Sequence, residues 1–391
     1  MKIAIFSDCH CGFDYGEARG EDSFRAMEEA FQKSKDADII LLAGDIFDTR
    51  IPRPEVFARV AKIIRRAKKY KSNARLVEID GNDPPIITGT PVVAIHGTHE
   101  RRMREMVNPV QLLEDTGQII YLQNSRVVFE IDGKKVAIHG MSGVPERYAK
   151  DVLKEWNPKP VPDAINIFVF HQSLEPYIYS PLEPPTLTLN DLPDGFDLYV
   201  LGHIHWHDVV RVKSGILLLT GSTCLTSIHK NEAQQKKGIF IYDGKDVNFL
   251  PLEYQREVIF EDVQLDEKTN LADVAKRIAT NLPHSNLKPI LSINLIGKIL
   301  PSHDINRFEQ MLSNYAIVNL KRSESIEESV QMIALESEKI SPEESGLKIL
   351  KEMLEGRKNH LPIEELFELL VEGDTDKATQ ILLQRAGVEY D

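Results

Sequence analysis

Five short clusters of acidic residues and histidines are spread over the first 205 residues of the chain. They are Asp8-Cys9-His10, Gly44-Asp45-Ile46-Phe47-Asp48, His96-Gly97-Thr98-His99-Glu100, His171-Gln172 and Gly202-His203-Ile204-His205. One histidine beside an apolar segment is usually structural, but Asp and His recurring at five places indicate a metal centre. Mixed carboxylate and imidazole ligation suits manganese or iron better than a thiolate-bound structural zinc site.

The spacing within these clusters predicts how the donor atoms converge. In a strand, residues i and i+2 point to the same side, so Asp8 and His10 can present their donors together. His203 and His205 form a second pair of this kind. Asp45 follows an apolar segment and a glycine, and its two oxygens can bridge two ions. Two neighbouring cations hold the attacking and leaving oxygens of a phosphoryl displacement, so we expect phosphate ester hydrolysis.

Each cluster follows a short apolar segment that is predicted to be a buried strand. The predicted strands are residues 2–7, 39–43, 92–96, 135–139, 166–170 and 197–201, with helices at 21–35 and 53–70. Alternating strands and helices are typical of layered α/β proteins. Residues 209–252 instead have the glycine spacing of β-hairpins. We therefore expect an α/β fold of two packed sheets flanked by helices, with the chemistry at the strand ends.

The pattern changes near residue 256. Strand, helix, strand, helix and strand are predicted at 256–264, 271–281, 288–298, 303–315 and 317–322, as a small α/β domain. Serine and glutamate are frequent in the following segment, as in a linker. The tail is predicted to be helical, because Ser341-Pro342-Glu343-Glu344 supplies an N-cap and a first-turn proline. The predicted domains are 1–255, 256–322, 323–340 and 341–391.

Two apolar faces in the tail predict a partner. At helical spacing, they consist of Leu347, Leu350 and Leu354, and of Ile363, Leu366, Phe367 and Leu370. Short helices behind a polar linker cannot bury such faces by themselves. We expect a partner surface to cover them, with docking back onto this chain as the alternative.

Composition limits the class of protein. With 42% apolar and 27% charged residues, the chain is an ordinary globular one, and its apolar runs fall short of the roughly 20 residues of a membrane span. The N-terminus enters a strand pattern without the features of a signal peptide, which predicts a cytoplasmic protein. A net charge of −13 argues against coating nucleic acid through overall charge. Cys9, Cys11 and Cys224 fit no disulfide or zinc framework, so we expect reduced thiols, with Cys9 and Cys11 in packing roles.

In this order, the five clusters resemble those of the calcineurin-like metallophosphoesterases over residues 1–255. The segments GDIFDTRIPRP, NPVQLLED, IHGM, FHQ, LNDLP and GHIH are similar to the DNA double-strand-break repair nucleases of the meiotic recombination protein eleven and SbcD family. The resemblance implies a DNA exonuclease and endonuclease with two Mn²⁺ per chain, Fe²⁺ or Mg²⁺ being alternatives. It also implies a DNA-positioning role for 256–322 and a homodimer through helices such as 53–70 or 108–115. The partners that the resemblance implies for this chain are double-stranded and single-stranded DNA ends and a Rad-fifty or SbcC-type coiled-coil ATPase bound by the tail.

The resemblance also assigns site residues. It gives Asp8, His10, Asp45 and His205 to one metal, and Asp45, His171 and His203 to the other. His99 would donate a hydrogen bond or proton to the scissile phosphate or its departing oxygen. The family usually has Asn at the position of Thr98, so Thr98 or water completes the second metal, or that site is looser. Asp48 stands where many relatives have a histidine linked to exonuclease action.

Three arginines follow the predicted proton donor. We expect Arg101, Arg102 and Arg104 to bind backbone phosphates, with a solvated loop as the alternative. No base-reading motif is present in the sequence, so binding independent of DNA sequence is expected. Two other functions stay open: a phosphomonoesterase or cyclic nucleotide phosphodiesterase with the same metals, and a non-catalytic DNA-end scaffold with an eroded second metal site.

Overall fold

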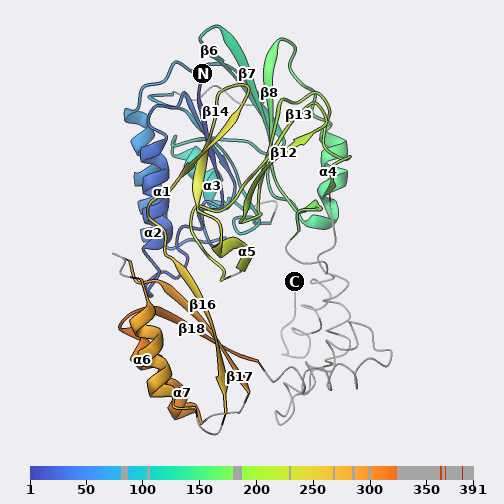
Figure 1. Ribbon diagram of the computed structural model, residues 1–391. Helices are drawn as coiled ribbons and strands as arrows, with labels where there is room; N and C mark the ends of the chain where they lie inside the picture. The colour runs from blue at the N-terminus through green and yellow to red at the C-terminus, as the bar shows by residue number, and fades with distance from the viewer. Residues whose placement is uncertain are drawn as a thin grey trace. The chain divides into compact units, whose positions relative to one another are not determined.

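The computed structural model describes most of the chain up to residue 323. The described residues are 1–80, 87–103, 106–178, 187–228, 230–266, 269–283, 287–297 and 301–323, with Pro362, Leu366 and Ile381 in the tail. Two sheets with helices on their outer faces make up the part before residue 252 (Figure 1). This arrangement confirms the predicted fold class.

The first sheet has six strands in the order β15-β14-β1-β2-β4-β5. Their bounds are Val247–Pro251, Gly238–Tyr242, Ile3–Phe6, Ile39–Ala43, Val92–Ile95 and Ile120–Tyr121. β1, β2, β4 and β5 are parallel, whereas β14 pairs antiparallel with β1 and forms a hairpin with β15. The carboxyl ends of neighbouring parallel strands meet at one edge, so the first three clusters come together there.

The second sheet has seven strands in the order β12-β13-β11-β8-β7-β6-β3. Their bounds are His207–Val212, Gly215–Thr220, Leu198–Gly202, Ala164–His171, Lys134–Met141, Ser125–Ile131 and Arg75–Ile79. β8 and β11 are parallel, with His171 beside Gly202. The last two clusters therefore lie at neighbouring strand ends. Leu174–Glu175 (β9) and Leu187–Thr188 (β10) form a separate pair.

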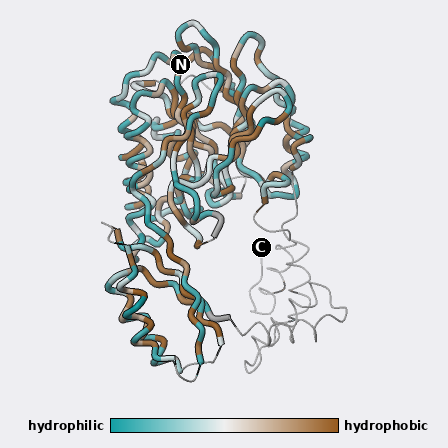
Figure 2. Tube along the Cα trace, in the orientation of Figure 1, coloured by the Kyte–Doolittle hydropathy of each residue, from teal (hydrophilic) through white to brown (hydrophobic). Residues whose placement is uncertain are grey.

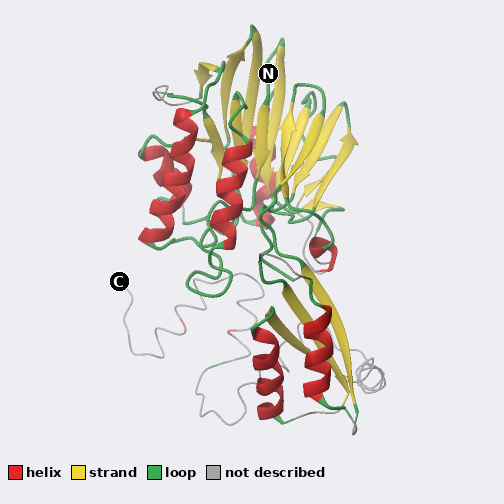
Figure 3. Cartoon of the chain, turned by 60° about the vertical axis from the view of Figure 1, so that its left-hand side comes forward, coloured by secondary structure: helices red, strands yellow, loops and turns green. Residues whose placement is uncertain are grey.

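Helices cover the outer faces of both sheets, as Figures 1 and 3 show. They are α1 (Asp22–Lys33), α2 (Pro54–Ile64), α3 (Pro109–Asp115) and α4 (Ala149–Trp156), with 3-10 turns η1 (Arg65–Lys69) and η2 (Glu146–Tyr148). The short α5 (Lys230–Ala233) lies at the strand ends instead. The predicted helix at 53–70 is α2 continued by η1. Pro54 begins α2, where its missing N–H leaves no bond unmade. Asn108 caps α3 by accepting bonds from the Val110 and Gln111 amides.

Alternating strand residues build three hydrophobic layers. In β1 and β2, Phe6 and Leu42 face α1 and α2, whereas Ile5 and Leu41 face the second sheet. A third cluster lies between the second sheet and α4 and contains Phe168. Strands buried on both faces appear as continuous apolar runs, which is why the sequence pattern revealed them (Figure 2).

A three-stranded sheet and two helices follow residue 256. The strands are β16 (Val258–Leu265), β17 (Ile290–Gly297) and β18 (Ile317–Ser323), and the helices are α6 (Leu271–Asn281) and α7 (Ser302–Ser313). These elements match the predicted strand and helix order. The domain limits at 255, 322 and 340 stay predictions.

The predicted partner-binding tail falls almost entirely outside the described residues. Leu347, Leu350, Leu354, Ile363, Phe367 and Leu370 all lie outside them. Within the described residues, the Leu366 amide donates to the Pro362 carbonyl at 3.0 Å. No helix in the described part of the chain is long and apolar enough to span a membrane.

Candidate metal centre

The five clusters meet at the carboxyl ends of the central strands. Donor atoms of Asp8, His10 and His205 lie within 4.8 Å of one another, as do those of Asp8, Asp45 and His171. Asp8 belongs to both groups, so two ions bound there would be neighbours. The bridging role assigned to Asp45 stays a prediction.

Left-handed backbone, rather than strand alternation, turns these donors inward. Asp8, His10, Asp45 and His203 have φ values of 50°, 44°, 48° and 86° and lie after β1, β2 and β11. The same-side rule for i and i+2 therefore gave the right pair at Asp8 and His10 for the wrong reason, and His203 does not share a donor group with His205. The loops are held by the Asp8 amide, which donates to the Gly44 carbonyl at 3.0 Å, and by the His10 amide, which donates to the Asp45 carbonyl at 2.9 Å.

His171 provides the test of whether a cation fits. Its Nδ1 donates to the Ala43 carbonyl at 2.8 Å, so Nε2 is the nitrogen left to bind a proton or a metal ion, and it faces Asp45 Oδ2 at 3.2 Å and Asp8 Oδ1 at 4.0 Å. Nε2 is buried and has no hydrogen-bond partner among the described residues. Burial opposes the charged ring, but Asp45 and Asp8 raise the pKa of His171 to about 10. A ring nitrogen directed at two carboxylates requires a cation between them, which is either a proton on that nitrogen or a metal ion.

The other donor group also fits a metal. His10 Nε2 and His205 Nε2 face each other at 3.1 Å, each within 3.9 Å of Asp8 Oδ1. A carboxylate can only accept, and only one proton fits between the two facing Nε2 atoms, so these atoms supply several lone pairs to one point. Nitrogen and oxygen donors of this kind suit Mn²⁺ or Fe²⁺.

His203 lies beside these groups but in neither of them. Its amide donates to both carboxylate oxygens of Asp8, at 3.2 and 3.1 Å, and its ring packs edge-on against His171 at 5.4 Å. Its Nε2 lies 3.3 Å from the Ser173 hydroxyl. Burial and the neighbouring His171 lower the pKa of His203 to about 3. A neutral ring is what metal ligation requires, and that role stays a prediction.

The loop after β4 holds the Asp45 carboxylate. The Thr98 hydroxyl donates to Asp45 Oδ2 at 3.3 Å and the His99 amide donates to Oδ1 at 2.9 Å. Gly97 is needed here because an added Cβ would overlap the same carboxylate. Thr98 therefore lies at the second donor group.

Glu100 has a structural role that the sequence analysis did not assign. The side chain is buried and accepts bonds from the Phe47 amide at 2.8 Å and the Gly97 amide at 2.9 Å. It thereby joins the loop of Asp45 to the loop of Thr98. The only sign of this role in the sequence is a carboxyl group directly after His99. The fold is needed to show which amides donate hydrogen bonds to it.

His99 and Asp48 form a third group with His10. His99 Nδ1 donates to the Asp48 carbonyl at 2.9 Å, and its side chain is 46% exposed. Since a carbonyl only accepts, Nδ1 carries a hydrogen, and Nε2 is the nitrogen available to a substrate. The Asp48 carboxylate also lies 3.2 Å from His10 Nδ1. Asp48 therefore helps to orient both rings.

The predicted DNA-binding arginines differ from one another. Arg101 is half-buried, and burial together with nearby Arg50 lowers its pKa. Arg102 donates to the Val107 carbonyl at 3.1 Å and approaches the Met106 sulfur at 3.2 Å, so it is engaged within its own loop. Arg104 lies outside the described residues. Their binding to DNA stays a prediction.

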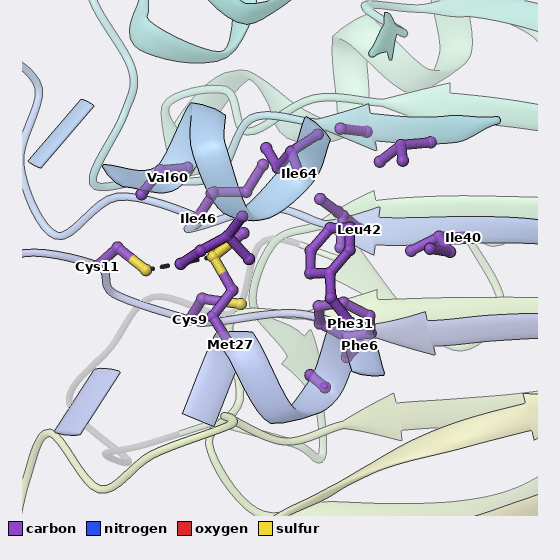
Figure 4. Close-up of a cluster of buried hydrophobic side chains, with 14 of the residues drawn as sticks. Phe6, Cys9, Cys11, Met27, Phe31, Ile40, Leu42, Ile46, Val60 and Ile64 are labelled. Atoms are coloured by element: carbon purple, nitrogen blue, oxygen red, sulfur yellow. Dashed lines mark hydrogen bonds between the residues drawn. The ribbon is translucent and has the colours of Figure 1, made fainter. Parts of the chain in front are cut away.

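Cys9 and Cys11 pack away from the metal centre, as predicted. Cys9 and Cys11 are buried in the hydrophobic cluster between the first sheet and α1 and α2 (Figure 4). The Cys11 sulfur lies 3.4 Å from the Met27 sulfur, an interaction that Figure 4 draws. Burial raises the pKa of the Cys11 thiol well above its usual value, so it is protonated and inert.

Several known proteins are similar to this chain in sequence. Residues 1–207 match the family model described as calcineurin-like phosphoesterase. The double-strand break repair protein MRE11 of Encephalitozoon cuniculi is 26% identical over 70% of this chain and 51% of its own length. Mre11 of Methanopyrus kandleri is 28% identical over 52% of this chain and 44% of its own length. Mre11 of Sulfurisphaera tokodaii is 26% identical over 81% of this chain and 78% of its own.

This chain spans about half the length of the Encephalitozoon and Methanopyrus proteins. The family model, by contrast, covers more than half of the chain's 391 residues, and it includes all five clusters. The chain therefore belongs to the calcineurin-like phosphoesterase family.

Proposed function

We propose that this protein is a manganese-dependent DNA nuclease that hydrolyses phosphodiesters at double-strand breaks. The observation that carries the proposal is the pair of donor groups that share Asp8. Relatives named for double-strand break repair support DNA as the substrate. The proposal includes exonuclease and endonuclease action on double-stranded and single-stranded ends.

The residues that would hold two ions follow from the donor groups. Asp8, His10 and His205 would hold one ion, and Asp45 and His171, with His203 and Thr98 beside them, would hold the other. When bound, such ions stabilise the charge of the reacting phosphate and supply a hydroxide nucleophile. Glu100 keeps the two loops that carry Asp45 and Thr98 at a fixed separation.

His99 would serve as proton donor to the departing oxygen. Its Nδ1 hydrogen is engaged by the Asp48 carbonyl, so the second proton of the imidazolium resides on Nε2. Transfer of that proton to the leaving oxygen would avoid an unstable alkoxide. The Asp48 carbonyl then keeps the neutral ring in place.

The decisive experiment compares wild type with His99→Ala and a control, His303→Ala, whose imidazole is 80% exposed on α7. End-labelled duplex and hairpin DNA would be incubated with Mn²⁺, Mg²⁺ or chelator, alongside a generic phosphomonoester. We expect Mn²⁺-dependent DNA cleavage that His99→Ala lowers by roughly 100-fold or more and His303→Ala leaves unchanged.

Other results would replace this proposal. Phosphomonoester turnover without DNA cleavage would indicate the phosphatase alternative, which uses the same fold and metals. DNA binding with neither activity would indicate a scaffold.

We also propose that the tail binds a Rad-fifty or SbcC-type ATPase and that the chain dimerises. Its sequence places two apolar faces after a polar linker, which supports a coiled-coil partner. Deleting residues 341–391 should abolish capture of the ATPase and spare Mn²⁺-dependent cleavage by the isolated chain. Retained capture by the truncated protein would show that the partner surface lies elsewhere.

A further inference from the structure

A buried ion pair lies behind His205, outside the donor groups described above. The side chains of Lys237 and Glu232 are only 3% and 2% exposed, and Lys237 Nζ lies 2.8 Å from Glu232 Oε1. Both residues follow position 207, where the family match ends. Burying two charges costs desolvation free energy, and apolar residues often replace such a pair without loss of stability. Stability alone therefore does not explain this pair.

The contacts of the pair converge on His205 from its main chain. Lys237 Nζ donates to the His205 carbonyl at 2.9 Å and to the Ser222 hydroxyl at 2.7 Å. The Ser222 amide donates to the same carbonyl at 3.1 Å. Two donors thus fix the backbone of His205, and the ammonium uses its third donor on Glu232.

The pair also acts on the ring of His205. Glu232 Oε2 lies 3.8 Å from Nδ1, and the Thr226 hydroxyl lies 3.1 Å from the same atom. Nε2 faces the opposite way, toward Asp8 Oδ1 at 3.8 Å. A carboxylate near Nδ1 favours the tautomer with hydrogen on Nδ1 and leaves the Nε2 lone pair directed at the metal centre. Histidine ligands of metals are commonly oriented in this way by a carboxylate.

We propose that Glu232 and Lys237 are positioning residues that fix the backbone, ring orientation and tautomer of His205 as a metal ligand. The expected loss of Mn²⁺ affinity rests on the proposed function, whereas the expected tautomer of His205 does not. Neutralising Glu232 should let the ring populate both tautomers. The affinity of the full chain for Mn²⁺ should then fall by about 10- to 100-fold, as for other partners of metal ligands.

The test uses the full-length chain with two readouts. Nitrogen-15 NMR of labelled histidine reports the tautomer of His205 in metal-free protein, and calorimetric titration with Mn²⁺ alone reports affinity. In wild type and in the control Asp194→Asn, which removes the exposed Lys213–Asp194 pair, we expect an Nδ1–H tautomer and full affinity. Glu232→Gln should give a mixed tautomer and weaker binding.

Two further variants keep the test decisive if Glu232→Gln fails to fold. Glu232→Gln combined with Lys237→Met leaves no unpaired buried charge, so it should regain the melting temperature but not the Mn²⁺ affinity. Thr226→Val removes only the hydroxyl beside Nδ1 and should shift the tautomer in the same direction.

The outcomes separate the two proposals. An unchanged tautomer in Glu232→Gln, or affinity restored together with stability in the double variant, would overturn the positioning role. If the variants show the expected tautomer change but the wild-type chain binds no Mn²⁺, the result would contradict the proposed function alone.

Discussion

Two buried histidines at strand ends show how the same residue serves opposite purposes. His96 follows β4 and His171 ends β8, and both are buried. His96 has a partner at each nitrogen: the Tyr121 hydroxyl at 2.5 Å from Nδ1 and the Gly143 carbonyl at 3.0 Å from Nε2. His171 has the Ala43 carbonyl at Nδ1, but its Nε2 faces carboxylates.

The difference is visible in their protonation. Burial lowers the pKa of His96 to about 4, so it is a neutral structural ring. For His171, burial acts in the same direction, but Asp45 and Asp8 outweigh it and raise the pKa to about 10. The partner atoms, rather than the degree of burial, decide which of the two rings can attract a metal ion.

The largest expected effect is a loss of Mn²⁺ affinity when His171, the histidine that faces the carboxylates, is replaced. His171→Gln removes a ring nitrogen between two carboxylates. We expect Mn²⁺ affinity to fall by more than the roughly 100-fold that loss of an outer-sphere partner can cause. Calorimetric titration would measure the Mn²⁺ affinity, with His96→Gln as the matched control. If the partners of the ring decide which histidine binds metal, the affinity of this control should stay within about threefold of wild type. Equal losses in both variants would contradict the distinction.

The next effect concerns pH. Because the pKa of His171 is raised to about 10, a proton occupies Nε2 at neutral pH and Mn²⁺ must displace it. Affinity should rise as pH increases, by about tenfold per unit for one released proton, and should level off only above the pKa. Titrations at pH 6.5 to 8 in buffers of different ionisation enthalpy would count the proton. Absence of proton release would show that Nε2 is already unprotonated.

A smaller effect tests the structural role of His96. His96→Gln disrupts hydrogen bonds to Tyr121 and Gly143, and we expect a loss of about 1–3 kcal/mol in the free energy of unfolding. The acid dependence should change as well. With a folded pKa of about 4 against 6.5, wild type loses stability as pH falls from 6.5 to about 4, by about 1.4 kcal/mol per unit. Denaturant titrations should show a shallower acid dependence in His96→Gln, and an identical dependence would exclude His96 as its source.

The smallest expected effect concerns Thr98, beside the His171 donor group. The Thr98 hydroxyl donates to Asp45 Oδ2 and is a weaker neutral ligand than an amide carbonyl. Thr98→Asn should raise Mn²⁺ affinity or activity, by up to about tenfold, a change of about 1.4 kcal/mol. Calorimetry and the nuclease assay would measure it, with Thr98→Ala as control. If neither quantity changes, the second site is not weakened by Thr98.

The sequence predicted the strands because they are buried on both faces and so form continuous apolar runs. It predicted the metal centre because Asp and His recur directly after those strands, as at Asp8, Asp45 and His171. It also predicted the packing of Cys9 and Cys11 against the core. These features are local, and short-range patterns carry them.

Only the tertiary structure decided which partners each side chain meets. The left-handed conformation of Asp8 and His10 and the two amides bound by Glu100 depend on loops that meet across the sheet edge. The Lys237 and Glu232 contacts to His205 join segments about 30 residues apart, and no local pattern encodes them. Hydrogen-bond direction and charge environment are properties of the assembled site, so the difference between His96 and His171 appears only once the chain has folded.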